Sequence, residues 1–163
     1  MSSPPAPSTR CLWLIALGLV ASLAAAAEHA PWVLLPPEQA SAVVQQCSRA
    51  VPRITGTWVP TARDIRRLEA DLKTLRGRAA EACCAPKARL DDPHQYLRQY
   101  AGVLREGKRV IYVNAFRQDP FAGSANEWHK TPVIVCNGDP GNWGVLYDPE
   151  TRRFFRLAFN GNG

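Results

Sequence analysis

YLRQYAGVLREGKRVIYVNAF, residues 96–116, is the stretch that decides the fold. It contains two runs rich in β-branched and aromatic residues, 96–105 and 108–116, and this composition is typical of β-strands. Glu106 and Gly107 separate the two runs, and glycine readily adopts the positive φ that a two-residue hairpin turn requires. The sequence therefore predicts an antiparallel β-hairpin here.

Three more apolar runs follow the hairpin, at 132–136, 143–147 and 153–159. The residues between the first two of these runs, Asn-Gly-Asp-Pro-Gly-Asn, are almost all turn formers. Asp148 and Pro149 open a second short turn, in which we expect the Asp148 carboxylate to bond nearby backbone N–H groups. Because short connections join antiparallel neighbours, we expect a curved antiparallel meander of four to five strands.

The clearest helix begins at Thr61, which is a favourable N-cap and forms an approximate capping box with Asp64. Its apolar residues recur at three- and four-residue steps and form one stripe: Ile65, Leu68, Leu72 and Leu75. The pattern continues through Gly77 as far as Cys84, where Pro86 stops it. We therefore expect one long helix, whose apolar stripe needs a sheet to cover it.

A shorter helix is predicted over residues 37–49, since Pro37 suits a first helical turn and Pro52 ends the pattern. Residues 54–59 are expected to form a short strand or an extended lead-in to the next helix. These elements predict an α+β domain, with one long helix packed on the antiparallel meander and a shorter helix before it.

The first thirty residues have the three-part form of a secretion signal. Arg10 precedes an apolar run over 12–20, and small residues then lead to a cleavage site after Ala27, with a second possible site after Ala30. An uncleaved membrane anchor is the alternative, but a span needs about 20 strongly apolar residues and this run is shorter. We predict a signal peptide over 1–27, a periplasmic or secreted product, and no stable membrane span after processing.

Processing leaves one domain, residues 28–163, with four cysteines: Cys47, Cys83, Cys84 and Cys136. An even number of cysteines in an exported domain predicts two disulfides. Adjacent Cα atoms lie about 3.8 Å apart, which is closer than most disulfides allow. We therefore expect Cys83 and Cys84 to pair separately, one with Cys47 and the other with Cys136. A strained redox-active ring between the adjacent cysteines is the alternative, and no ligand spacing indicates a metal site.

The formal charge of the whole chain is +6. Such a bias favours anionic partners in general. The basic residues nevertheless alternate with acids, most clearly over 63–76, which is typical of a solvated helix face. We therefore predict no nucleic-acid partner.

Six fragments of the chain support a resemblance: WVP at 58–60, YLRQYAG at 96–102, IYVN at 111–114, VCNG at 135–138, WGVLYD at 143–148 and FNG at 159–161. Together they resemble a small family of uncharacterised exported proteins of Gram-negative bacteria. The resemblance covers most of residues 58–161 but implies no activity and no site. The order of helix and meander is also similar to cystatin-like folds, which include inhibitors, ligand carriers and enzymes alike.

Only one connection is long, residues 117–131, and loops of this length are often functional. Aromatic and polar side chains of the strands, together with this loop, could line an open concave face that holds an apolar or sugar-like ligand or a partner's loop. The candidate residues are Tyr100, Tyr112, Asn114, Trp128, His129 and Trp143. The alternative is that these rings pack against the long helix as core.

No catalytic, cofactor or metal signature is present in the sequence. We therefore expect a binding module that holds a small ligand or an exported protein on this face and loop. One alternative is a small exported hydrolase that uses His129 with Glu127 or Asp119 as general base. The other is an inhibitor or interaction protein that acts on another exported protein.

Overall fold

The structure is a computed structural model that describes residues 30–82, 85, 87–117, 127–136 and 141–161. Contacts divide the chain into residues 1–30 and 31–163, and every helix and strand named below belongs to the second unit. The predicted signal peptide lies outside the described residues. The helices are α2 (Pro37–Val44), α3 (Ala62–Asp71) and two 3-10 turns, η1 (Leu72–Leu75) and η2 (Pro93–Gln95). The strands are β1 (Trp32–Leu34), β2 (Gly56–Thr57), β3 (Leu97–Arg105), β4 (Lys108–Phe116), β5 (Trp143–Asp148) and β6 (Arg153–Phe159).

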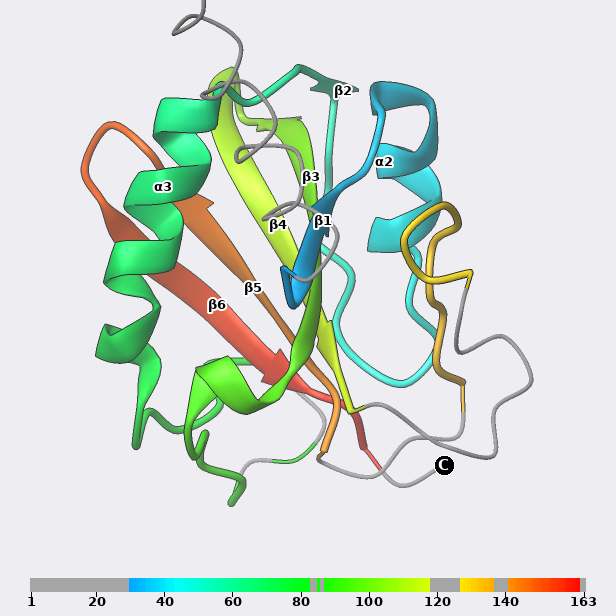
Figure 1. Cartoon of the computed structure of the whole chain (residues 1–163). Coiled ribbons are helices and arrows are strands. Elements are labelled where there is room, and N and C mark those ends of the chain that lie inside the picture. The colour runs from blue at the N-terminus through cyan, green and yellow to red at the C-terminus, as the bar shows by residue number, and fades with distance from the viewer. Residues whose placement is uncertain (1–29, 83–84, 86, 118–126, 137–140, 162–163) are drawn as a thin grey trace, which may run out of the picture. The chain divides into compact units, whose positions relative to one another are not determined.

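One six-stranded sheet forms the middle layer, with α3 on one face and α2 on the other (Figure 1). Strands β3 to β6 are antiparallel neighbours in chain order, which confirms the predicted α+β class and the meander. Glu106 and Gly107 have φ of 52° and 77°, as the hairpin prediction requires. Two further strands pair with β3, β1 in parallel and β2 antiparallel.

Helix α3 begins where the sequence predicts, at Thr61, and the capping box with Asp64 is formed. The four residues of its apolar stripe are buried against the sheet, a contribution of roughly 6 to 12 kcal/mol before entropy is counted. The expected long helix is not formed, because ten α-helical residues and four 3-10 residues end at Leu75. Gly77 has φ of 76°, a conformation that helices do not contain.

The opposite face is covered by α2 and by the described residues 127–136. Two predictions were wrong here. Residues 132–136 form no strand, because side chains rather than a neighbouring strand satisfy their backbone. Gln46, for example, donates to Val133 O at 3.0 Å and accepts from Val135 N at 3.3 Å. Helix α2 ends at Val44 rather than at Arg49, since this side chain of Gln46 turns back to Val43 O.

The disulfide joins Cys47 to Cys136. The expectation that each of these cysteines pairs with Cys83 or Cys84 is therefore wrong. In the fold, the end of α2 lies beside residues 127–136, which cover the same face of the sheet. The spacing of the cysteines in the sequence does not predict this proximity. Cys83 and Cys84 lie outside the described residues.

Ion pairs and hydrogen bonds attach α3 to the sheet. Arg152 donates to both carboxylate oxygens of Asp71, and Tyr147 Oη donates to the same carboxylate at 2.7 Å. The hydrogen bonds from Arg152 lower the pKa of Asp71 below its ordinary value of 3.8, against the opposing effect of partial burial. Two residues earlier in the helix, Glu69 accepts from Arg98 at 3.3 Å and from Tyr100. No helix among the described residues is long and apolar enough to cross a membrane.

The disulfide joins two cysteines that are 89 residues apart in the sequence. Its loss therefore increases the conformational entropy of the unfolded chain. We expect Cys47→Ala combined with Cys136→Ala to lower the free energy of unfolding by about 4 to 5 kcal/mol. Urea unfolding of the variant and the parent measures the difference. A non-reducing peptide map in which Cys47 and Cys136 occur in separate peptides would contradict the pairing.

The lowered pKa of Asp71 makes part of the stability dependent on pH. A depressed folded-state pKa gives stability that is fully present above the unfolded pKa of about 3.9 and is lost as the pH falls through the folded value. We expect Asp71→Asn to cost about 1 to 2 kcal/mol at pH 7 and clearly less near pH 3. Urea midpoints across this range provide the measurement. Asp91→Asn, at an exposed acid, is the control, and an equal pH slope in the parent and Asp71→Asn would refute the assignment.

Candidate functional site

The predicted ligand surface is divided between the two faces of the sheet. Tyr100 and Trp143 are fully buried in the core under α3. Tyr112 and Asn114 lie on the opposite face of β4, where Tyr112 belongs to the core cluster around α2. All four side chains are almost completely enclosed. The structure therefore does not bring the candidate residues together on one open face.

The described end of the long loop also lacks a catalytic pair. Trp128 is buried edge-on against Phe116, with ring centroids 6.0 Å apart. The His129 ring lies against Trp128, with centroids 3.6 Å apart, and is exposed to solvent. No hydrogen bond joins His129 to Glu127, although both are described. Asp119 lies outside the described residues.

A layer of buried amides holds this loop end on the sheet. Gln99 Nε2 donates to Trp128 O at 2.7 Å and to Thr131 O at 2.6 Å. Asn114 Nδ2 donates to Val133 O at 2.9 Å. The polar residues of this face therefore have a clear structural role, because they satisfy backbone groups that belong to no sheet. Asn114 also takes part in a second arrangement.

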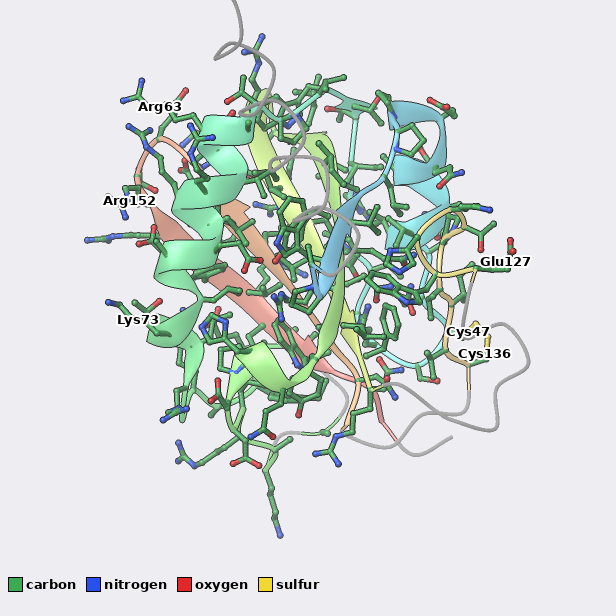
Figure 2. The ribbon with its side chains drawn as sticks, viewed as in Figure 1. Cys47, Arg63, Lys73, Glu127, Cys136 and Arg152 are labelled. Carbon is green, nitrogen blue, oxygen red and sulfur yellow. A yellow bond between two sulfur atoms is a disulfide. The ribbon has the colours of Figure 1, made fainter. Side chains whose placement is uncertain are left out.

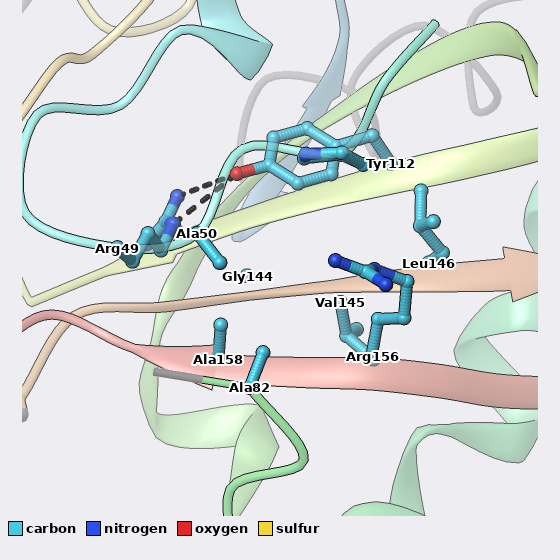
Figure 3. Close-up of a pocket in the computed structure, with 10 residues that line it drawn as sticks. Arg49, Ala50, Ala82, Tyr112, Gly144, Val145, Leu146, Arg156 and Ala158 are labelled. Carbon is cyan, nitrogen blue, oxygen red and sulfur yellow. Dashed lines mark hydrogen bonds between the residues drawn. The ribbon is translucent and has the colours of Figure 1, made fainter. Parts of the chain in front are cut away.

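Arg49 is the centre of that arrangement. Its side chain is only 5% exposed, and its Nε and Nη2 donate to Tyr112 Oη at 3.2 and 2.9 Å (Figure 3). Nη1 donates to Asn160 Oδ1 at 3.1 Å, and Nη2 also donates to Asn114 Oδ1. Every one of these acceptors is neutral. Within the part of the chain that the structure describes, no carboxylate forms an ion pair with Arg49.

A buried guanidinium without a counter-ion is unusual, because charge is costly to remove from water unless it is paired. Neutral acceptors reduce that cost but do not cancel the charge. Tyr112 accepts both of its bonds from Arg49, and among the described residues its own O–H has no acceptor. The arrangement therefore presents positive charge and a free hydroxyl donor at the same place.

Arg156 approaches the same place from β6. Two residues of β6, Arg156 and Leu157, occupy the space opposite Val145, which makes this position a β-bulge. Arg156 has φ of 58°, a left-handed conformation that costs about 1 to 2 kcal/mol outside glycine. Its backbone N–H donates to Glu81 Oε2 at 2.6 Å, which holds the bulge in place. Bulges of this kind redirect a side chain, and here the redirected side chain is a cation.

The two arginines line one small pocket, which we call the arginine pocket (Figure 3). Its walls are Arg49, Ala50, Pro52, Ala82, Tyr112, Gly144, Val145, Leu146, Arg156 and Ala158. The free volume is about 10 Å³, which is room for one water-sized atom. Arg156 is exposed, and among the described residues its guanidinium has no hydrogen-bond or ion-pair partner.

Gly144 makes this pocket possible. A Cβ atom at this position would lie 2.7 Å from Tyr112 Oη and 3.0 Å from Arg49 Nε. Both distances are shorter than real Cβ contacts tolerate, and Arg49 is fixed by four hydrogen bonds. Only glycine therefore allows the Arg49 guanidinium to approach β5 this closely.

A second cavity of about 540 Å³ lies where β3 begins and β4 ends. Its walls are Ala85, Lys87, Ala88, Arg89, Asp91, Tyr96, Arg117 and Gly141. Four of these residues flank stretches outside the described residues, so the described part of the chain does not define its shape. The arginine pocket, in contrast, borders an undescribed stretch at only one of its described wall residues, Ala82.

Sequence reasoning missed both arginines. It placed Arg49 at the end of a surface helix, where nothing distinguishes it from other basic residues. For Arg156 a signal existed, because Phe154 and Leu157 are both apolar although strict alternation would put them on opposite faces. In the structure both belong to the core under α3, and the odd spacing is the mark of the bulge.

The polar groups of the arginine pocket are suited to an anion. It offers two guanidinium groups and a phenolic O–H, all of which are hydrogen-bond donors. Carboxylate and phosphoryl oxygens are the acceptors that arginine binds most strongly. No cluster of three or more metal-ligating residues is found in the described ranges.

The close approach of Gly144 to Arg49 gives a direct test of the pocket geometry. We expect Gly144→Ala to lower the free energy of unfolding by about 1 to 3 kcal/mol, because the new methyl group displaces Arg49 or Tyr112. Thermal or urea unfolding measures this loss. Gly56→Ala is the matched control, since its Cβ would meet only the Leu104 side chain, at 3.2 Å. Equal effects at the two glycines would contradict the packing described.

No protein family, no curated protein and no solved structure matches this chain. A function must therefore be argued from the geometry of the site.

Proposed function

We propose that this chain is an exported binding module without catalytic activity, which recognises an anionic group at the arginine pocket. The group is a carboxylate or a phosphoryl oxygen, held between Arg49 and Arg156 with Tyr112 as a third donor. The observation that carries the proposal is that Arg49 is 5% exposed and contacts only neutral acceptors. A bound anion would supply the missing negative charge.

The size of the pocket limits how the ligand binds. About 10 Å³ admits one oxygen atom rather than a whole molecule, so the rest of the ligand extends toward solvent. Arg156 borders the pocket and is exposed, so it is free to turn its two terminal NH2 groups toward the bound anion. A free metabolite and an acidic side chain of an exported partner protein offer the same chemistry here. The proposal thus replaces the expected concave face and loop with a specific cationic site.

Export is supported by two features. The N-terminal sequence has the form of a secretion signal, and disulfides are stable mainly outside the reducing cytosol. The Cys47–Cys136 bond lies two residues before Arg49 and fixes the chain that presents it. An oxidising compartment would therefore keep the pocket assembled.

The hydrolase and inhibitor hypotheses differ from this proposal in what they require. A hydrolase needs His129 and a carboxylate in contact, and no contact among the described residues favours that pair. An inhibitor or interaction protein is compatible with the pocket if the partner contributes an acidic side chain. His129→Ala should accordingly leave anion binding unchanged.

Thermal unfolding of the mature domain with added anions tests the proposal. We expect phosphate or citrate to stabilise the parent relative to chloride at equal ionic strength, by about 2.7 kcal/mol at a hundredfold excess over the dissociation constant. Arg156→Asn should abolish this stabilisation without unfolding the domain, since asparagine tolerates the left-handed conformation.

Arg153→Asn is the matched control, because it removes an exposed arginine from the same strand outside the pocket. It should respond to the anions like the parent. Equal loss of the response in both variants would show a general charge effect and would refute the site. Absence of any anion effect in the parent, together with no capture of acidic partner proteins, would refute the proposal as a whole.

A further inference from the structure

The outer face of α3 and the η1 turn that continues it carry a second group of uncompensated cations, on the opposite side of the sheet from the arginine pocket. We call it the α3 basic face and define it by Arg63, Arg66, Arg67 and Lys73. Figure 2 shows Arg63 and Lys73 projecting away from the sheet. No ion pair involves any of these four side chains in the described part of the chain.

The acids of the same helix do not neutralise this face, although the sequence alternates acids and bases there. Asp64 is held by Thr61 in the capping box. Glu69 accepts from Arg98 and Tyr100, beneath the helix. Asp71 accepts from Arg152 and Tyr147 on the sheet side. The structure therefore bonds Glu69 and Asp71 to bases outside the helix and Asp64 to its N-cap, while Arg63, Arg66 and Lys73 are exposed and Arg67 is half-exposed.

This arrangement works against the helix itself. Arg63 lies in the first turn, where the helix dipole disfavours cations. Arg63, Arg66 and Arg67 are spaced by three and four residues, so that like charges repel across one turn. Lys73 continues the row seven residues after Arg66. These unfavourable charge positions are not offset by an ion pair among the described residues. They indicate an anionic partner that offsets the repulsion when it binds.

We infer that the α3 basic face docks on a membrane surface rich in anionic phospholipid. The headgroup phosphates form a layer of negative charge, which suits a row of cations presented on a rigid helix. Among the described residues the only exposed large hydrophobic side chains are Val59 and Ile134, neither of which lies on α3. Binding is therefore electrostatic, with no insertion into the lipid core.

Single-stranded nucleic acid fits this face less well. Proteins that bind it combine cations with exposed aromatic rings on which bases stack. No aromatic side chain is among the exposed large hydrophobic residues of the described chain. Duplex DNA, which needs no stacking, is kept as an alternative outcome of the experiment.

Docking through α3 leaves the arginine pocket accessible. The pocket contains Tyr112 and Leu146, which belong to the core cluster around α2. Helix α3 covers the other face of the sheet (Figure 1). A domain bound in this way would turn the pocket toward the aqueous phase. Membrane docking does not depend on anion binding at the pocket, because the two sites share no residue.

Vesicle co-sedimentation of the mature domain tests the inference. We expect binding to vesicles of equal parts phosphatidylglycerol and phosphatidylcholine, and none to phosphatidylcholine alone. Each basic residue near an anionic surface adds about fivefold to the binding constant, so replacing all four by glutamine should weaken binding several hundredfold. Added sodium chloride should release the parent domain.

The control variant replaces four exposed basic residues of other elements by glutamine: Arg53, Lys87, Lys108 and Lys130. It loses the same net charge and should still bind the anionic vesicles. Arg156→Asn should also bind them, which separates this surface from the arginine pocket. Unfolding curves confirm that each variant is folded.

Three results would overturn the inference. One is failure of the parent domain to bind the anionic vesicles. Another is equal weakening in the control variant, since total charge and not the α3 basic face would then decide binding. The third is tighter binding of duplex DNA than of the anionic vesicles at the same salt concentration.

Discussion

Burial of β4 on both faces is the constraint on which the rest of the structure depends. From Val110 to Phe116 every residue of this strand is buried, so each face needs its own cover. On one face α3 supplies leucines and the core is apolar. On the other, α2 is only eight residues long and covers part of the strand. Residues 127–136 complete this second cover.

Because α2 is too short to cover the whole second face of β4, an irregular segment covers the rest, and this explains why the face is polar. A segment without regular structure brings backbone groups that must be hydrogen-bonded inside the protein. Gln99 and Asn114 on the sheet and Gln46 after α2 satisfy them. The Cys47–Cys136 disulfide then fixes the segment covalently. Arg49 enters this layer two residues after Cys47, and among the described buried side chains of this face it alone carries a charge.

Both proposals rest on the same electrostatic feature, which is the separation of cations from carboxylates. Glu69 and Asp71 of α3 are bonded to Arg98 and Arg152, whereas among the described residues no ion pair involves the cations of the arginine pocket or of the α3 basic face. A net charge of +6 alone does not predict this arrangement. Both proposals therefore depend on the distribution of charge rather than on its sum.

Local patterns in the sequence determined the elements of this protein. The turn at Glu106 and Gly107, the cap at Thr61 and the turn at Asp148 depend on contacts within a few residues, and all three form as predicted. The α+β class follows from their order. The predicted helix length and the 132–136 strand were wrong, because Gly77 ends the helical path and tertiary side-chain bonds replace the strand ladder.

Only the tertiary structure decided which distant residues meet. Cys47 and Cys136 are 89 residues apart, and Arg49 and Arg156 come together only because α2 ends early and β6 bulges. Four of the six residues predicted as a ligand surface lie on strands and were divided between two faces by the pleat, and all six but His129 are buried. The spacing of residues in the sequence predicts local geometry, such as turns and helix caps. A binding site, in contrast, depends on contacts between distant segments, and their separation along the chain does not determine how far apart they lie in space.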